Sequence, residues 1–191
     1  MSSLPSTSVA QSFDPRQLHA VRVEDAPVID GRLDEPVWTA TEPIGGFLQR
    51  DPVEGDPASE DSEIRVAYDE DALYIAARLF DREPSAIVRQ LSRRDVAVEA
   101  DALVVYLDPH HDHLTGAQFG VSAAGVQRDA LIYNDQFLDV TWDAVWASAV
   151  QIDDRGWAVE MRIPLSQLRF PAADRYVAHQ RAARDPAAQR V

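Results

Sequence analysis

The sequence predicts an all-β protein, an antiparallel β-sandwich of the jelly-roll or immunoglobulin-like kind with one or two short helices. The clearest observation is the stretch from Gly156 to Ile163, in which apolar residues alternate with residues such as Glu160 and Arg162. This period of two places the apolar residues on one face of a strand, and Pro164 then removes a backbone donor and ends it. The second observation is the number of short apolar runs separated by turns, with little helical periodicity. A strand that buries one face needs a second layer opposite it.

Length and composition limit the range of functions. The 191 residues suffice for one domain with tails. The net charge of −14, from 18 basic and 32 acidic residues, repels phosphate backbones and anionic lipids, so no nucleic-acid partner is expected. No apolar run approaches the roughly 20 residues that span a bilayer, so no direct membrane insertion is expected. The absence of cysteine excludes disulfides and thiolate metal sites but does not decide the compartment.

The sandwich is expected to occupy residues 18–177. Its strands are expected, in chain order, at 18–23, 28–29, 44–50, 64–68, 73–80, 104–107, 117–122, 126–133, 142–152 and 156–163. The runs 64–68 and 73–80 are joined by an acidic turn and are predicted to form one antiparallel hairpin. A second hairpin is predicted from 117–122 and 126–133.

Two segments are predicted to be helical. Asp34 is placed as an N-cap, with Pro36 in the first turn and Trp38 facing inward as a core anchor. Residues 83–94 carry apolar residues at helical spacing and end in basic residues, which a helix C-terminus favours. A further helical turn over 165–170 is expected to fold back over the core.

The two ends of the sequence are expected to be tails. Residues 1–17 form an N-terminal tail without the basic start or apolar stretch of a signal peptide. Residues 8–11 are similar to the small-residue end of a cleavage region, so we expect an export signal upstream, with a plain disordered tail as the alternative. With that signal the protein would be periplasmic, outer-membrane-associated or secreted. Residues 178–191 have no strand period and are expected to be an irregular tail, truncated or frameshifted.

Four segments, in order, resemble family 9 carbohydrate-binding modules over about residues 18–176. They are Ile29 to Trp38, Tyr68 to Ala76, Asp101 to Asp108, and Gly156 to Leu168. Shorter segments resemble one bacterial subgroup in which the module precedes an outer-membrane-barrel-like region: 93–95, 125–129, 142–146 and 168–170. The resemblance implies a β-sandwich that binds a saccharide, often beside a glycoside hydrolase domain and often with structural calcium.

A sugar-binding site needs a rigid, exposed aromatic for the C–H face of the ring and polar groups for its hydroxyls. Trp142 is the candidate platform because it follows an acidic loop at a strand end; the alternative is a lid on the core edge. Trp146, four residues on, would lie on the same face of a strand, or pack inside. The polar residues around the same loop could equally form a solvated hairpin edge. The predicted ligand-binding residues are Trp142, Trp146, Arg128, Asp129, Tyr133 and Asn134.

The sequence gives less support for a metal site. Residues 108–113 combine histidines with aspartates, which suit zinc or copper, but nothing in the sequence fixes the geometry, so a surface loop is the better interpretation. Calcium would use Asp30, Asp34 or the acids at 69–71, and their spacing matches no closed calcium loop. No cofactor is therefore predicted, and structural calcium stays an alternative.

The chain is predicted not to be an enzyme. It has no Gly-x-Ser-x-Gly, no glycine-rich phosphate loop and no His-Glu-x-x-His. Glu160 lies on the polar side of its strand and is interpreted as a cross-strand or surface acid. Any glycoside hydrolysis or carbohydrate catabolism would belong to a partner domain. The rival function is a structural N-terminal domain of an outer-membrane protein, with no affinity for sugar.

Overall fold

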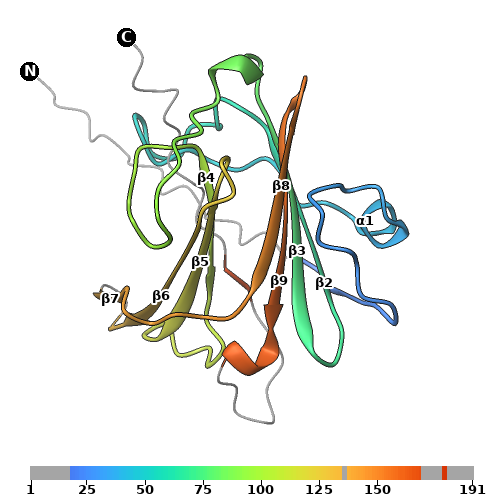
Figure 1. Ribbon diagram of the computed structural model, residues 1–191, viewed down its shortest axis with the longest axis vertical. Coiled ribbons are helices and arrows are strands. Elements are labelled where there is room, and N and C mark those ends of the chain that lie inside the picture. Colours follow the sequence, from blue (N-terminus) through green and yellow to red (C-terminus); the bar gives the residue numbers. More distant parts are fainter. Residues whose placement is uncertain (1–17, 135–136, 169–177, 180–191) are drawn as a thin grey trace, which may run out of the picture.

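The computed structural model describes residues 18–134, 137–168 and 178–179. The elements are β1 (Val21–Arg22), α1 (Pro36–Ala40), β2 (Ser62–Tyr68), β3 (Ala72–Phe80), η1 (Pro84–Ala86), β4 (Ala102–Leu107), β5 (Gly116–Ser122), β6 (Gln127–Tyr133), β7 (Phe137–Asp139), β8 (Ala147–Asp153), β9 (Gly156–Pro164), η2 (Leu165–Gln167) and β10 (Ala178–His179). Here η marks a turn of 3₁₀-helix. The strands form two five-stranded sheets that face each other (Figure 1).

The first sheet has the order β1-β2-β3-β9-β8 and the second the order β10-β4-β5-β6-β7. Neighbouring strands are antiparallel except for β1, which pairs in parallel with β2. The two predicted hairpins are confirmed as β2–β3 and β5–β6, and the prediction of an all-β sandwich is confirmed with them.

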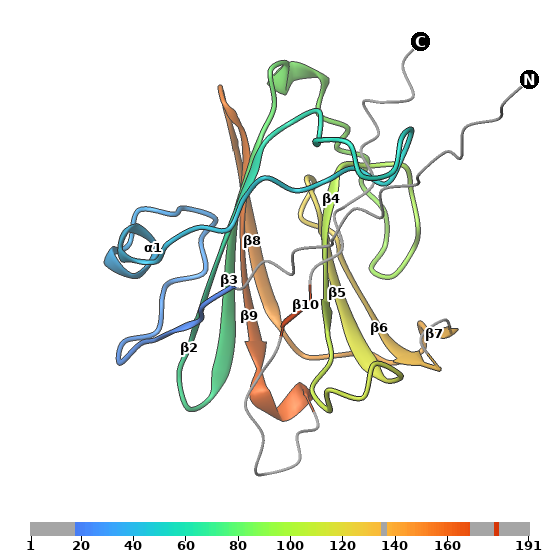
Figure 2. The ribbon, with the colours of Figure 1, turned by 180° about the vertical axis from the view of Figure 1, so that it is seen from behind.

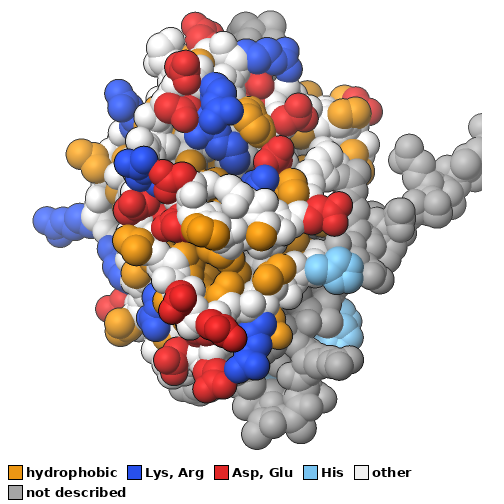
Figure 3. All heavy atoms as spheres, turned by 90° about the vertical axis from the view of Figure 1, so that its right-hand side faces the viewer, with side chains coloured by type: hydrophobic (Ala, Val, Ile, Leu, Met, Phe, Trp, Pro, Cys, Tyr) orange, Lys and Arg blue, Asp and Glu red, His pale blue; other side chains and the backbone are white. Residues whose placement is uncertain are grey.

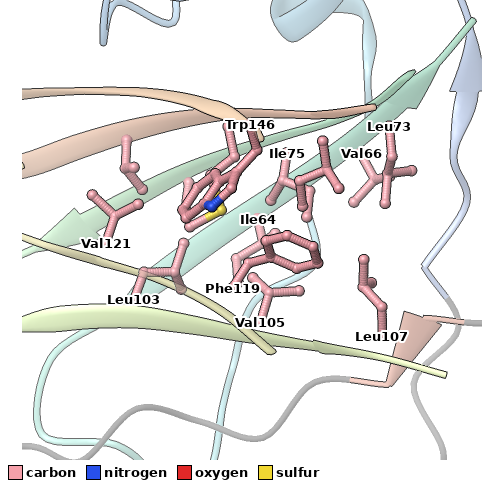
Figure 4. Packing of buried hydrophobic residues seen from close by; sticks show 14 of the residues in the cluster. Ile64, Val66, Leu73, Ile75, Leu103, Val105, Leu107, Phe119, Val121 and Trp146 are labelled. Atoms are coloured by element: carbon pink, nitrogen blue, oxygen red, sulfur yellow. The ribbon is translucent and has the colours of Figure 1, made fainter. Parts of the chain in front are cut away.

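The main core fills the space between the sheets. Side chains of β2 and β3, such as Val66 and Ile75, point toward side chains of β4 and β5, such as Val105 and Phe119 (Figure 4). The predicted alternation in β9 holds, because Trp157, at 4% exposure, and the other apolar residues at odd positions face this core. Side chains that pack between the two sheets remove apolar surface from water. This burial is the main source of stability for two packed sheets.

A second cluster lies on the outer face of the first sheet. Trp38 of α1, 1% exposed, packs there against Tyr74 and the alanines of β2 and β3. Seen from behind, α1 and the chain leading to it stand outside the first sheet, beside β2 and β3 (Figure 2). On the α1 side of the molecule, acidic and basic side chains are interspersed around hydrophobic ones (Figure 3). The first sheet is therefore covered on both faces along part of its length.

This covering explains why the prediction of Glu160 as a surface acid is wrong. Its side chain is fully buried under the α1 segment, and its carboxylate accepts hydrogen bonds from the Trp38 indole (2.7 Å) and from the backbone N–H groups of Gly31 (2.8 Å) and Asp30 (3.0 Å). Burial raises the pKa of Glu160 above its ordinary value, and these hydrogen bonds act in the opposite direction. Glu160 thus ties the Asp30–Trp38 segment to the sheet.

Several predicted elements differ from the structure. Residues 28–29 do not form a strand. Residues 44–50 form two isolated β-bridges and no strand. The predicted helix over 83–94 is wrong beyond the single turn η1, because Val88 exchanges backbone and side-chain hydrogen bonds with Asp101 at the start of β4. These tertiary contacts outweigh local helix propensity.

The N-cap prediction is also wrong. Glu35 precedes α1 without a side-chain cap, whereas the Asp34 carboxylate pairs with the Arg32 guanidinium at 2.7 Å. The helical turn expected after Pro164 is present as η2, and Leu168 is buried behind it. Residues 1–17 and Phe170 lie outside the described residues. Of the predicted C-terminal tail, Ala178 and His179 are described and pair with β4.

Candidate functional site

The residues predicted to bind a sugar surround the connection between β7 and β8. This connection, residues 140–146, crosses the lower end of the sandwich from the second sheet to the first (Figure 1). The predicted strand over 142–152 begins at Ala147, so the argument that Trp142 and Trp146 share one strand face is wrong. Both tryptophans nevertheless pack toward one place.

That place is the ring of Phe119 in β5. The Trp142 ring meets it edge-on, with centroids 5.8 Å apart and an angle of 72° between the rings. The Trp146 ring meets it at 5.3 Å and 81°. Trp146 is 8% exposed and belongs to the main core, whereas Trp142 is half-buried at the edge of that core. Of the two indoles, Trp142 is the one with open surface for a ligand.

Asp129 of β6 fixes the connection in place. Its side chain is fully buried and accepts hydrogen bonds from the backbone N–H of Ala144 (2.7 Å), from the Trp146 indole N–H (3.0 Å) and from the Arg94 guanidinium. An ionised carboxylate with three donors is well compensated in a buried position. Asp129 therefore holds the segment that carries Trp142, and its own side chain is closed off from solvent.

Arg94 is a part of the site that the sequence indicated only as the end of a helix and as part of the subgroup resemblance. Its guanidinium also donates to the backbone carbonyl of Ala144 (2.6 Å) and to the side-chain oxygen of Gln127 (3.0 Å), and it lies 3.2 Å from the carboxylate of Asp143. The neighbouring Asp95 accepts the Asp129 backbone N–H at 2.9 Å. Residues 93–95, 125–129 and 142–146, which carried the subgroup resemblance, thus meet in one network.

The carboxylates of this network could suggest a cation site. Oxygens of Asp95, Asp129 and Asp143 lie within 4.8 Å of one another. The Arg94 guanidinium contacts all three, so the positive charge that such a group requires is supplied by the chain itself. The network is therefore interpreted as structural.

Two exposed aromatics stand near this connection at the end of the second sheet. Tyr133 and Phe137 are directly opposite each other in the β6–β7 pair and are 43% and 66% exposed. They share a strand face with Leu131, which packs against the main core, so they point to the side on which Trp142 lies. We call Tyr133, Phe137 and Trp142 the aromatic rim. Phe137 was missed because its segment was predicted to be a loop.

The structure separates the other predicted residues. Arg128 is half-buried on the opposite face of β6, where its partner across the pair is Gly120. It lines a pocket of about 60 Å³ together with small and apolar side chains, below the roughly 300 Å³ at which ligand pockets begin. Asn134 is exposed and follows Tyr133 directly, at a positive φ of 49°.

A larger hollow of about 470 Å³ opens at the far end of β3. Its lining includes Phe80, Arg82 and Arg155 together with three carboxylates. Arg82 is already paired with Glu60 at 3.3 Å, and the Phe80 ring lies 5.6 Å below the Arg78 guanidinium. Because this ring is already occupied on one face, the aromatic rim offers the better platform.

Two of the acids considered for calcium, Asp30 and Asp69, already accept hydrogen bonds. Asp30 accepts the backbone N–H of Arg32 at 2.9 Å. Asp69 accepts two backbone N–H groups and the Tyr74 hydroxyl, each at 2.7 Å. Burial alone would raise the pKa of Asp69, but these hydrogen bonds outweigh it and the pKa is lowered. Structural calcium at these acids stays an alternative to the prediction of no cofactor.

Among the described residues, no helix combines the length and apolar character that crossing a membrane requires.

Comparison with known proteins agrees on the fold. The family model described as "Carbohydrate family 9 binding domain-like" matches residues 29–191. A carbohydrate-binding module family 9 from Caldicellulosiruptor kristjanssonii is similar in its complex with cellotriose (TM-score 0.56, 19% identity, 78% of this chain and 68% of that one). Its complex with glucose is similar as well (TM-score 0.57, 19% identity, 91% and 83%).

A putative carbohydrate-binding protein from Bacteroides uniformis ATCC 8492 has a TM-score of 0.58 at 13% identity, over 78% of this chain and 72% of that one. At these identities the likeness shows the fold alone. No curated protein matches the sequence.

Proposed function

Since the chain belongs to the carbohydrate family 9 binding domain-like family, we propose that it binds a saccharide without transforming it. The observation that carries this proposal is the support of Trp142. Its indole is half-buried and rests edge-on against Phe119, and its segment is tied to β6 through Asp129. A ring held in this way is pre-organised, so little conformational entropy is lost when a sugar stacks on it.

The neighbouring groups suit a neutral polyol. Tyr133 and Phe137 extend the apolar surface on the same side of the second sheet. Asp143 is 79% exposed next to Arg94, and Asn134 is exposed at the end of β6. Carboxylate, guanidinium and amide groups can donate to and accept from sugar hydroxyls. The proposed site is thus an open rim for one or a few sugar units.

The finer part of the proposal concerns the context of this module. By family resemblance, we place it beside another domain, a glycoside hydrolase or an outer-membrane-barrel-like region, in a protein that is exported to the periplasm or beyond. Hydrolysis and carbohydrate catabolism would then belong to that partner, and this chain would supply affinity for the substrate. The support is the family and the subgroup segments that meet at Arg94.

The test is binding of soluble glycans by isothermal titration calorimetry and affinity electrophoresis, with glucose, cellotriose and a panel of other oligosaccharides. Substituting Trp142→Ala should weaken binding at least about tenfold, equivalent to roughly 1.4 kcal/mol of lost stacking. Phe137→Ala should also weaken binding, whereas Leu138→Ala, next in sequence and on the opposite face, should not.

Failure of the folded wild-type chain to bind any glycan of the panel would overturn the proposal. That outcome would favour the rival structural function, for which the specific observation is a run of exposed apolar side chains at Phe137, Leu138 and Val140.

A further inference from the structure

The loop between β4 and β5 concentrates histidine. Three of the five histidines of the chain fall within four residues, His110, His111 and His113, and all three are exposed. We call residues 108–115 the histidine loop. It lies at the same end of the sandwich as the aromatic rim, because β4 runs antiparallel to β5 and β5 to β6.

Two aspartates shape the histidine loop from inside. The Asp108 carboxylate accepts the backbone N–H groups of His110 (3.1 Å), Asp112 (3.3 Å) and His113 (2.9 Å). The Asp112 carboxylate accepts the backbone N–H groups of Leu114 (2.8 Å) and Thr115 (2.7 Å) and the Thr115 hydroxyl (2.8 Å). These bonds hold the pKa of Asp112 at about 2. The loop therefore has the fixed geometry that its sequence did not reveal.

That geometry brings two imidazoles together. In an extended chain, alternate residues such as His111 and His113 point to the same side. Here both adopt positive φ values, 50° and 56°, and their ring centroids lie 4.9 Å apart. Histidine is among the few residues enriched in this left-handed region. The two side chains therefore lie on the same side of the loop although its backbone is turned.

The separation matches shared coordination. A metal–nitrogen bond of about 2.0–2.1 Å places the ring centroid roughly 3.2 Å from the ion. Two imidazoles on one ion then have centroids about 4.5 Å apart at a right angle and about 5.2 Å apart at the tetrahedral angle. The observed value lies between these limits. The Asp108 carboxylate lies 3.9 Å from Nδ1 of His113, which is near the ring but beyond hydrogen-bond distance.

We propose that the histidine loop binds one transition-metal ion, zinc or copper(II), through His111 and His113, with water in the remaining positions. Imidazole nitrogen selects these ions over calcium and magnesium, which prefer oxygen. The site is separate from the carboxylates of the Arg94 network, and it does not depend on saccharide binding.

The test uses the untagged full chain, titrated with ZnCl₂ and CuSO₄ by calorimetry, with copper(II) electron paramagnetic resonance to count bound nitrogens. We expect one ion per chain and a signal from two imidazole nitrogens. His111→Ala and His113→Ala should each lower the metal affinity at least about tenfold. Even the loss of a residue that only hydrogen-bonds a metal ligand typically lowers metal affinity by about that factor. The matched control is His19→Ala, which removes an exposed imidazole from the N-terminal segment and should leave the affinity unchanged.

Circular dichroism checks that the variants stay folded, which is expected because both side chains are exposed. Zinc should also raise the unfolding temperature of the wild type and not of His111→Ala, since an ion that binds only the folded state stabilises it. The proposal is overturned by wild type without saturable binding, by a copper signal with fewer than two nitrogens, or by equal affinities of the His111→Ala and His19→Ala variants.

Discussion

Replacing Asp129 by asparagine tests whether the buried network holds the proposed site in place. One oxygen of Asp129 accepts the Ala144 N–H, and the other accepts the Trp146 indole and Arg94. An amide has one oxygen and one NH₂ group. In Asp129→Asn the NH₂ group, itself a donor, would therefore face either the Ala144 N–H or the Trp146 and Arg94 donors. An unsatisfied buried donor costs about 1–3 kcal/mol. Loss of the charge beside Arg94, which is 35% exposed, adds up to roughly 1 kcal/mol after screening.

The expected loss in the free energy of unfolding is therefore roughly 1–4 kcal/mol, measured by urea denaturation. Affinity for the glycan should fall as well, because the segment that carries Trp142 loses its attachment to β6. Asp143→Asn is the matched control: it makes the same change beside the same guanidinium, but at 79% exposure, and should change stability by less than about 0.5 kcal/mol. Equal losses in the free energy of unfolding for the two substitutions would refute the reasoning.

Two further predictions concern the fold. Because burial raises the pKa of Glu160 above its ordinary 4.5, the folded chain holds this proton more tightly than the unfolded chain; the free energy of unfolding should fall as pH rises from 4.5 through the raised pKa. Glu160→Gln should remove that part of the slope in a series of urea denaturations from pH 4.5 upward. An unchanged slope would count against the raised pKa of Glu160. Gly156→Ala should destabilise by more than about 2 kcal/mol, since an added Cβ would lie 2.2 Å from the Leu79 carbonyl oxygen at a φ of 131°. Gly125→Ala, also at positive φ but with open space around it, should cost about 1 kcal/mol, and similar values for the two would contradict the clash.

The sandwich could be predicted from the sequence because its signals are local. Alternation within β2, β5 and β9, and the short turns that follow β2 and β5, depend on neighbouring residues. Glu160 shows where this reasoning ends. Alternation gives the side of the strand on which it lies, but whether that side meets water depends on Trp38, 122 residues away in sequence. A long-range cover of this kind leaves no periodic trace in the strand itself.

The candidate site was predictable in part for the same reason. The sequence indicated the Trp142–Trp146 segment, but it could not show that Asp129 and Arg94, 35 residues apart, converge beneath it. Phe137 was hidden because β7 is three residues long, too short for a period of two to be recognised. The histidine loop was interpreted as a plain surface loop, since the aspartate hydrogen bonds that fix it depend on backbone geometry.

The most direct test of the account is the affinity of the folded chain for oligosaccharides, compared with that of Trp142→Ala, by calorimetry. We expect saturable binding of one ligand per chain by the wild type and at least about a tenfold loss in the variant. Wild type that binds no member of a panel of gluco-, xylo- and galacto-oligosaccharides, or a variant with undiminished affinity, would contradict a saccharide site at the aromatic rim.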